Sequence, residues 1–322
     1  MLRELILAAV ICLPLCARAA DAEGTITILD GDAFIYRGAS RFLAVEGVHL
    51  EGGDIVETRP SSFMQIEFPD LSVIQFGPET RAMLSGAGPA ARQKPEDWLF
   101  VMNGWCKVVG AKARAEGRPG LEVRTRAFEM PATPAVVVFN ERAADTTLFV
   151  ERGEVRLSER QASGSPVGVP LKAGDYYRRV AGARGTVNSG SNRGFVESVP
   201  RAFRDSLPLR LDRFRDKGVL PREAPDFTYA DVEAWLNAEP WLRRPFVQRW
   251  RVKAKDPAFR KALISSLASH PEWDPVLFPE KYLNKEQLAR RAVRSRAAAS
   301  EPSARPAAAR PAAEPASSPS TQ

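Results

Sequence analysis

The sequence predicts a mainly β protein whose strands are followed by a small helical subdomain and a disordered tail. Apolar and polar residues alternate with a period of two in short stretches between residues 24 and 200, and Gly and Pro separate these stretches. From about residue 201 the pattern changes to short helices that begin at capping residues. The chain has 322 residues, 44% hydrophobic and 26% charged, which allows one large or two small domains at roughly 150 residues each. This composition excludes a collagen, a membrane channel and a wholly disordered chain.

Residues 1–22 are typical of a cleavable secretory signal peptide. Arg3 precedes an apolar stretch at residues 5–15, and small residues at 17–19 stand at the cleavage spacing. The apolar stretch is shorter than the ~20 residues that span a bilayer, so an uncleaved anchor is the minor alternative. The bulky Leu15 before Cys16 disfavours lipidation. We therefore expect a periplasmic or secreted protein with no transmembrane helix in the mature chain.

The period of two is clearest in one segment of the β region. Met64, Ile66 and Phe68 alternate with Gln65 and Glu67, which predicts one face in the core and the other in water.

Two glycine-centred sites predict hairpins. Asn103-Gly104 lies between apolar stretches at 98–102 and 105–109, and both residues tolerate positive φ. Arg152-Gly153-Glu154 lies between 147–150 and 155–157 in the same manner. Strands at this spacing predict an antiparallel β-sandwich, a barrel or a short β-solenoid over residues 24–200.

Residues 201–296 predict a basic helical subdomain. Thr228 and Asp231 have the spacing of a capping box, Asp256 followed by Pro257 starts another helix, and Asn284 starts a last one. This region holds 21 Lys and Arg against 13 Asp and Glu, whereas residues 24–200 hold 21 of each. In an exported protein that excess favours an acidic partner protein or an anionic envelope polymer over nucleic acid. The Ala-, Pro- and Ser-rich residues 297–322 are expected to be disordered.

A series of short sequence motifs in a fixed order covers about residues 24–180. It opens with Gly31-Asp32-Ala33-Phe34 and Arg37, and its core is Gly53-Asp54-Ile55-Val56-Glu57-Thr58. The other motifs of the series lie at residues 45–50, 63–72, 76–80, 123–125, 149–155 and 171–175. The series resembles the FecR domain, a periplasmic module, with departures at Leu71, in place of a turn glycine, and at 131–135, in place of Arg-Gly-Thr.

In the family's regulators the periplasmic part relays a receptor signal, and for this chain the FecR resemblance implies a secreted, non-catalytic β module that binds or scaffolds. In the family's regulators a cytoplasmic anti-sigma segment and a membrane helix come first, whereas this sequence begins with an export signal. Anti-sigma activity is therefore not expected. From the residues themselves, Gly53 and Asp54 predict a turn in which Asp54 bonds its own downstream backbone.

Residues that suggest chemistry are few, and each has a structural interpretation. Cys106 and His49 form the only conceivable thiol–imidazole pair in the mature chain, but Cys106 lies in a period-two strand, which favours a buried, inert thiol. His270 is expected at a helix C-terminus. Residues 86–91 fit a dinucleotide-binding pattern that neighbouring prolines disfavour. Asp30-Gly31-Asp32 is favoured as a turn over a calcium site.

The aromatic residues between 241 and 255 also favour a structural interpretation. Trp241, Phe246 and Trp250 alternate with Arg and Lys residues, which predicts aromatics packed inward and cations in water. No catalytic, cofactor-binding or metal-binding residue is predicted, and no cofactor is expected. The favoured hypothesis is an exported, non-enzymatic FecR-type protein that binds a partner protein or an envelope polymer in signalling or scaffolding. The alternatives are an envelope hydrolase or transpeptidase that uses Cys106, and a structural module tethered by the tail.

Overall fold

The computed structural model describes residues 24–85, 98–111, 120–190 and 192–282. Its contacts divide the chain into two compact units, Met1–Glu233 and Ala234–Gln322, which are described separately. The predicted signal peptide, the loop at 86–91, the helix from Asn284 and the disordered tail lie outside the described residues.

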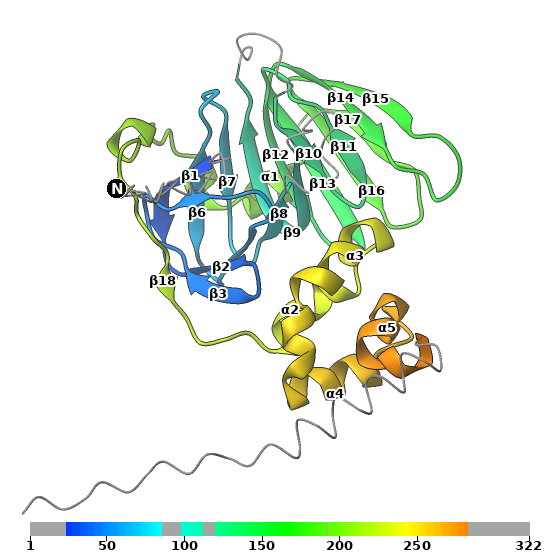
Figure 1. The fold of residues 1–322 in the computed structure, drawn as a ribbon. Helices are drawn as coiled ribbons and strands as arrows, with labels where there is room; N and C mark the ends of the chain where they lie inside the picture. The colour runs from blue at the N-terminus through cyan, green and yellow to red at the C-terminus, as the bar shows by residue number, and fades with distance from the viewer. Residues whose placement is uncertain (1–23, 86–97, 112–119, 191, 283–322) are drawn as a thin grey trace, which may run out of the picture. The chain divides into compact units, whose positions relative to one another are not determined.

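The first unit is mainly β and antiparallel, as predicted (Figure 1). Two sheets share the long strand β9 (Trp98–Val109). Sheet A runs in the order β4 (His49–Leu50), β1 (Gly24–Asp30), β6 (Phe63–Glu67), β7 (Val73–Phe76), β9, β12 (Val136–Glu141), β13 (Asp145–Arg152), β16 (Asp175–Val180), β17 (Thr186–Ser189). Sheet B runs in the order β18 (Arg222–Glu223), β3 (Ser40–Leu43), β2 (Ala33–Arg37), β5 (Ile55–Thr58), β8 (Arg81–Leu84), β9, β10 (Glu122–Arg124), β11 (Phe128–Met130), β14 (Glu154–Glu159), β15 (Val167–Lys172). Strands β9 and β10 are parallel.

The predicted hairpin at Asn103-Gly104 is wrong, because β9 continues through both residues. The strand pairs with β8 of sheet B up to Asn103 and with β12 of sheet A from Gly104 onward. Gly104 has φ +105°, and a Cβ there would lie 2.4 Å from the Cα of Thr80. The positive φ and the missing side chain thus bend one strand from sheet B into sheet A without reversing it.

The predicted hairpin at Gly153 is wrong for a related reason. Strand β13 before it belongs to sheet A and pairs with β12 and β16, whereas β14 after it belongs to sheet B and pairs with β11 and β15. Gly153 has φ +81° and is a corner between the sheets.

The main core lies between the two sheets. It is a single apolar cluster to which sheet A contributes residues such as Ile66 and Phe139, and sheet B residues such as Ile35 and Leu157, all buried. Met64 and Phe68 also belong to it, which confirms the predicted inward face of that segment. Full burial of each such side chain stabilises the fold by roughly 1.5–3 kcal/mol.

The second face of the same segment is also buried, so the prediction that Gln65 and Glu67 lie in water is wrong. Gln65 is 1% exposed and Glu67 2%. Residues 192–223, here called the strap, leave β17 and cross this face. They include α1 (Arg193–Ser198), the 3-10 helices Arg201–Phe203 and Leu211–Arg213, and β18. A second apolar cluster joins the strap to sheet A; it contains Phe63, Trp105, Val138, Tyr176, Phe195 and Phe203.

Residues 201–223 of the strap lie within the predicted helical segment, but their contacts place them in the β unit. The domain boundaries at residues 200 and 296 stay predictions. Helix α2 (Tyr229–Leu236) starts as the capping box predicts, because the Asp231 carboxylate accepts bonds from the N–H and hydroxyl of Thr228 at 2.7 and 2.8 Å.

The second unit consists of short helices. They are α3 (Pro240–Arg249), α4 (Pro257–Ser265), α5 (Asp274–Leu277) and the 3-10 helices Arg251–Lys255, Pro271–Trp273 and Pro279–Tyr282. Asp256 caps α4 as predicted by accepting a bond of 2.7 Å from the N–H of Phe259. No helix among the described residues is long and apolar enough to span a bilayer.

The aromatic residues of the basic stretch follow the predicted pattern only in part. Phe246 and Trp250 are buried and stacked, with ring centroids 4.3 Å apart. Trp241 is 38% exposed, and Lys253 is 7% exposed, so one aromatic lies outward and one cation is buried, contrary to the prediction.

Candidate binding site

Two residues of the FecR-like motifs, Arg37 and Asp54, form an ion pair inside the fold. Asp54, 1% exposed, receives two bonds from Arg37: Nε donates to Oδ1 at 3.0 Å and Nη2 to Oδ2 at 2.6 Å. The same guanidinium contacts the Glu51 carboxylate at 2.6 Å. Asp54 also accepts a bond from the N–H of Glu51, three residues upstream, at 2.9 Å and not from a downstream N–H as expected. Arg37 and Asp54 are therefore used to hold β2 against the turn before β5.

The same turn occurs a second time at Gly174-Asp175. Gly53 and Gly174 have φ of +89° and +90°. Asp175 accepts a bond of 2.9 Å from the N–H of Lys172, again three residues upstream, but its second oxygen receives the Ser189 hydroxyl at 3.3 Å where Asp54 receives an arginine. Both aspartates shape corners.

Cys106 and His49 are not brought together. Cys106 is fully buried in β9 between Phe76 of β7 and Phe139 of β12, and burial raises the pKa of its thiol well above the usual value. The ring nitrogens of His49 lie 2.9 Å from the Thr25 hydroxyl and 3.2 Å from the Lys217 carbonyl oxygen. Neither the nucleophile nor the base of the Cys106 hypothesis is in place.

The remaining sequence candidates are structural where they are described. Gly31 has φ +81° in the turn between β1 and β2, and Asp30 and Asp32 are exposed. His270 is buried directly before a 3-10 helix. Within the described ranges, no group of His, Cys, Asp and Glu residues could hold a metal ion.

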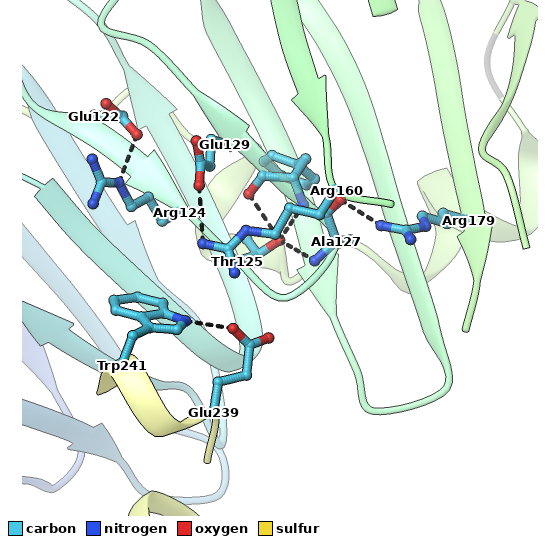
Figure 2. Close-up of polar contacts among 10 residues, drawn as sticks. Glu122, Arg124, Thr125, Ala127, Glu129, Arg160, Arg179, Glu239 and Trp241 are labelled. Carbon is cyan, nitrogen blue, oxygen red and sulfur yellow. Dashed lines mark hydrogen bonds and ion pairs between the residues drawn. The ribbon is translucent and has the colours of Figure 1, made fainter. Parts of the chain in front are cut away.

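Several polar contacts lie beside β10 and β11, and one of them joins the two sheets (Figure 2). Glu122 pairs with Arg124 at 2.6 Å, and Glu129 with Arg160 of the segment after β14 at 2.9 Å. From sheet A, Arg179 donates to the carbonyl oxygen of Ala127. The figure also draws a contact within the second unit, in which the Trp241 indole N–H donates to Glu239. These charged groups serve the fold.

Three of the four sheet edges are short, covered or interrupted. Strand β4 has two residues, and the strap lies along it, with a parallel bridge between Val48 and Val219. Strand β18 also has two residues, both charged. Strand β15 contains Pro170, which has no N–H to donate.

Strand β17 is the exception. Its sequence Thr-Val-Asn-Ser has neither a charge nor a proline, and all four residues are exposed. It pairs with β16 on one side, and no strand of the described residues pairs with its other side. An edge of this kind can accept a further strand. Sequence reasoning missed it because a four-residue segment with three polar residues resembles a loop.

No family model matches the chain, and no curated protein matches it. Two solved structures, each described as a "putative anti-sigma factor" from Parabacteroides distasonis, are similar to it at 14% and 15% identity with TM-scores of 0.34 and 0.33. Each similarity covers 44% of this chain and 62% of the other, so the chain spans less than two thirds of those proteins. This level of similarity carries no argument about function, and the FecR resemblance stays a prediction from sequence.

Proposed function

We propose that this chain is an exported, non-enzymatic module that binds a partner protein by pairing one of the partner's extended segments with β17. The open edge of β17, beside three edges that are blocked, is the observation that carries the proposal. Export rests on the signal-like sequence of residues 1–22. In strand addition the backbone supplies the hydrogen bonds, and neighbouring side chains select the partner.

The charges around β17 favour a different protein over a second copy of this chain. The hairpin that contains β16 and β17, residues 175–190, carries Arg178, Arg179 and Arg184 against one acid, Asp175, and it stays net positive when Asp145 of β13, which pairs with Arg178 at 3.0 Å, is included. Pairing β17 with itself would bring two such hairpins together and oppose like charges. A partner segment flanked by acidic residues avoids this repulsion and gains from the arginines.

The two other hypotheses fit the geometry less well. A cysteine hydrolase or transpeptidase needs an accessible thiolate, whereas the Cys106 thiol is buried. Binding of an anionic polymer through residues 241–255 needs cations in water. Arg244, Arg251 and Lys255 are exposed, but Lys253 is buried and Arg243 pairs with Glu272, so part of the predicted cationic face is used within the fold.

A photo-crosslinking experiment tests the proposal. A photoreactive amino acid at Val187 of β17 is compared with one at Val167 of β15, a valine of matched exposure, 42% against 41%, on the interrupted edge. Irradiation in the producing cells should give a covalent adduct with another protein from position 187 and none from 167. With the probe kept at 187, proline at Ser189 should abolish the adduct. The N–H of Gly190 donates to the Gly174 carbonyl oxygen on the β16 side, so the alternate N–H groups of residues 187 and 189 face outward.

Three outcomes contradict the proposal. They are equal adducts from both positions, adducts only with a second copy of this chain, and adducts only with envelope glycan. Mass spectrometry of the adduct distinguishes them.

A further inference from the structure

A groove lies on the outer face of sheet A, beside the strap, and has a volume of about 430 Å³. Three valines line one part of it: Val73 of β7, Val109 of β9 and Val136 of β12, which are neighbours in register. Residues 204–207 and Leu209 of the strap form the opposite wall. Its size lies within the range of small-ligand sites.

The polar part of the groove holds a buried acceptor that the fold leaves unused. Gln75 lines the groove and is 6% exposed. Its Nε2 donates to Oε1 of Gln65 at 2.9 Å, but its own Oε1 has no hydrogen-bond partner among the described residues. A buried carbonyl oxygen without a donor costs roughly 1–3 kcal/mol, so a ligand that supplies an N–H or O–H is favoured there.

The hydrogen bonds of Gln65 determine that the amide atom of Gln75 without a partner is its oxygen and not its nitrogen. Gln65 must turn its Nε2 toward Glu67 Oε1, 3.0 Å away, and toward the carbonyl oxygen of Pro208, 3.3 Å away, because both are acceptors. Its Oε1 therefore faces Gln75, which must present Nε2 in return. The unpaired atom of Gln75 is thus the acceptor Oε1, and a ligand that pairs with it must supply a donor.

The neighbouring strand β9 carries a hydrogen-bond donor, Lys107. Lys107 is opposite Gln75 in the β7–β9 register and also lines the groove. Its ammonium group donates to the Phe203 carbonyl oxygen at 2.7 Å and pairs with Glu151 at 2.8 Å, which uses two of its three N–H bonds. The groove is therefore lined by an unused acceptor, by a donor with one N–H left, and by the three valines.

We infer that this groove binds an extended peptide, at a site separate from β17. A backbone N–H of such a peptide suits Gln75 Oε1, and a backbone C=O suits the remaining N–H of Lys107. An apolar side chain of the peptide then covers the valines. A glycan is disfavoured because sugar rings stack on exposed aromatic faces, and no aromatic residue is among the described residues that line the groove. This inference does not rest on strand addition at β17.

Selection from a phage-displayed library of random nine-residue peptides, on the immobilised chain that follows residue 22, tests the inference. We expect enriched peptides with a shared apolar position. Gln75→Leu removes the acceptor, and Val109→Lys fills the groove from a partly exposed position, so each should weaken binding of these peptides at least tenfold. An ester in place of one peptide N–H should weaken it similarly. Val187→Pro in β17 should leave it unchanged.

Several results would overturn the inference. One is the absence of any enriched peptide on the wild-type chain, and another is binding that neither groove variant weakens. Loss in Val187→Pro alone would show that the peptides pair with β17, which supports the proposed function and not the groove. Displacement of the peptides by chitooligosaccharides would overturn the ligand class. Binding in the groove without crosslinks from position 187 would instead remove the proposed function alone.

Discussion

The two halves of the β unit on either side of β9 treat their edges and buried charges differently. The half formed by β1–β8 ends at β4 and β18, where the strap lies against β4 and becomes β18 itself. The half formed by β10–β17 ends at β15 and β17, and no described strand covers β17. The contrast shows that the strap closes the edges of one half only, so β17 is the edge at which a further strand can be added.

Three buried carboxylates also differ between the halves in how they are held, although Glu159 of the second half accepts bonds from the Tyr177 hydroxyl and the Gly185 N–H at 3.0 Å each. In the first half Asp54 is held by Arg37, and Glu67 accepts the backbone N–H groups of Arg210 and Leu211 at 2.9 Å each. In the second half Glu141 is 1% exposed, with the Thr146 hydroxyl at 2.9 Å and the Arg126 guanidinium 3.7 Å away. Four experiments test how far this comparison holds.

The largest expected effect is a difference in the free energy of unfolding lost when the aspartate of each Gly-Asp turn, Asp54 or Asp175, is replaced. Asp54→Ala leaves Arg37, whose side chain is 24% exposed, without its bidentate partner and should lower the free energy of unfolding by about 3–5 kcal/mol. Asp175→Ala removes only bonds from an N–H and a hydroxyl and should cost about 1–2 kcal/mol. Urea unfolding with linear extrapolation measures both. Equal losses would mean that the ion pair does not distinguish the halves.

The second effect is a pH dependence located in the open half. Desolvation raises the pKa of Glu141 from 4.5 to about 7, and the Thr146 hydroxyl and the Arg126 charge only partly oppose it. The folded state therefore holds a proton that the unfolded state releases, so stability falls as pH rises from 4.5 to 7 and is level above. At 1.36 kcal/mol per pKa unit the loss is up to about 3 kcal/mol.

Glu141→Gln should remove this contribution and stabilise the protein above pH 7. Urea unfolding at pH 4.5, 6 and 7.5 measures it in wild type and variant. An unchanged difference between pH 4.5 and 7.5 in the variant would assign the pH dependence to another group.

The third effect is local and belongs to the closed half. Glu67→Gln replaces one accepting oxygen by an amide N–H₂ that faces the N–H groups of Arg210 and Leu211. The strap should open locally by about 2 kcal/mol more easily, which corresponds to roughly 30-fold faster amide exchange at residues 210 and 211. The Gly174 amide, bonded to the Val150 carbonyl oxygen in the open half, is the control and should exchange as in wild type. Faster exchange at both places would indicate a global loss of stability.

The last prediction concerns Cys106 in β9, the strand that both halves share, and it is that the thiol does not react in the native protein. Cys106 is fully buried, and burial raises the pKa of its thiol, so native protein should resist iodoacetamide. Label should enter once urea unfolds the chain. Rapid native labelling would restore the hypothesis of a cysteine enzyme.

Much of the local structure follows from sequence pattern. Met64, Ile66 and Phe68 lie in the core as their alternation predicts, and Asp231 and Asp256 make the expected capping bonds. These features depend on neighbours within a few residues, so the sequence contains them directly.

The candidate sites could not be predicted in the same way. The groove needs Gln75, Lys107 and strap residues about 130 positions later, and β17 is recognised as an open edge only once the other three edges are known. Both depend on what distant segments cover or leave exposed.

What the sequence determined by itself is therefore the strand-rich front region, the glycines at positive φ and the helix caps, because each follows from local sterics and hydrogen bonding. Only the tertiary structure decided that Gly104 and Gly153 carry the chain between sheets and that Gln65 and Glu67 lie under the strap. A positive φ fixes the local direction of the backbone but not the strand that receives it. A period of two tells which residues share a face, but what lies against that face depends on residues far along the chain.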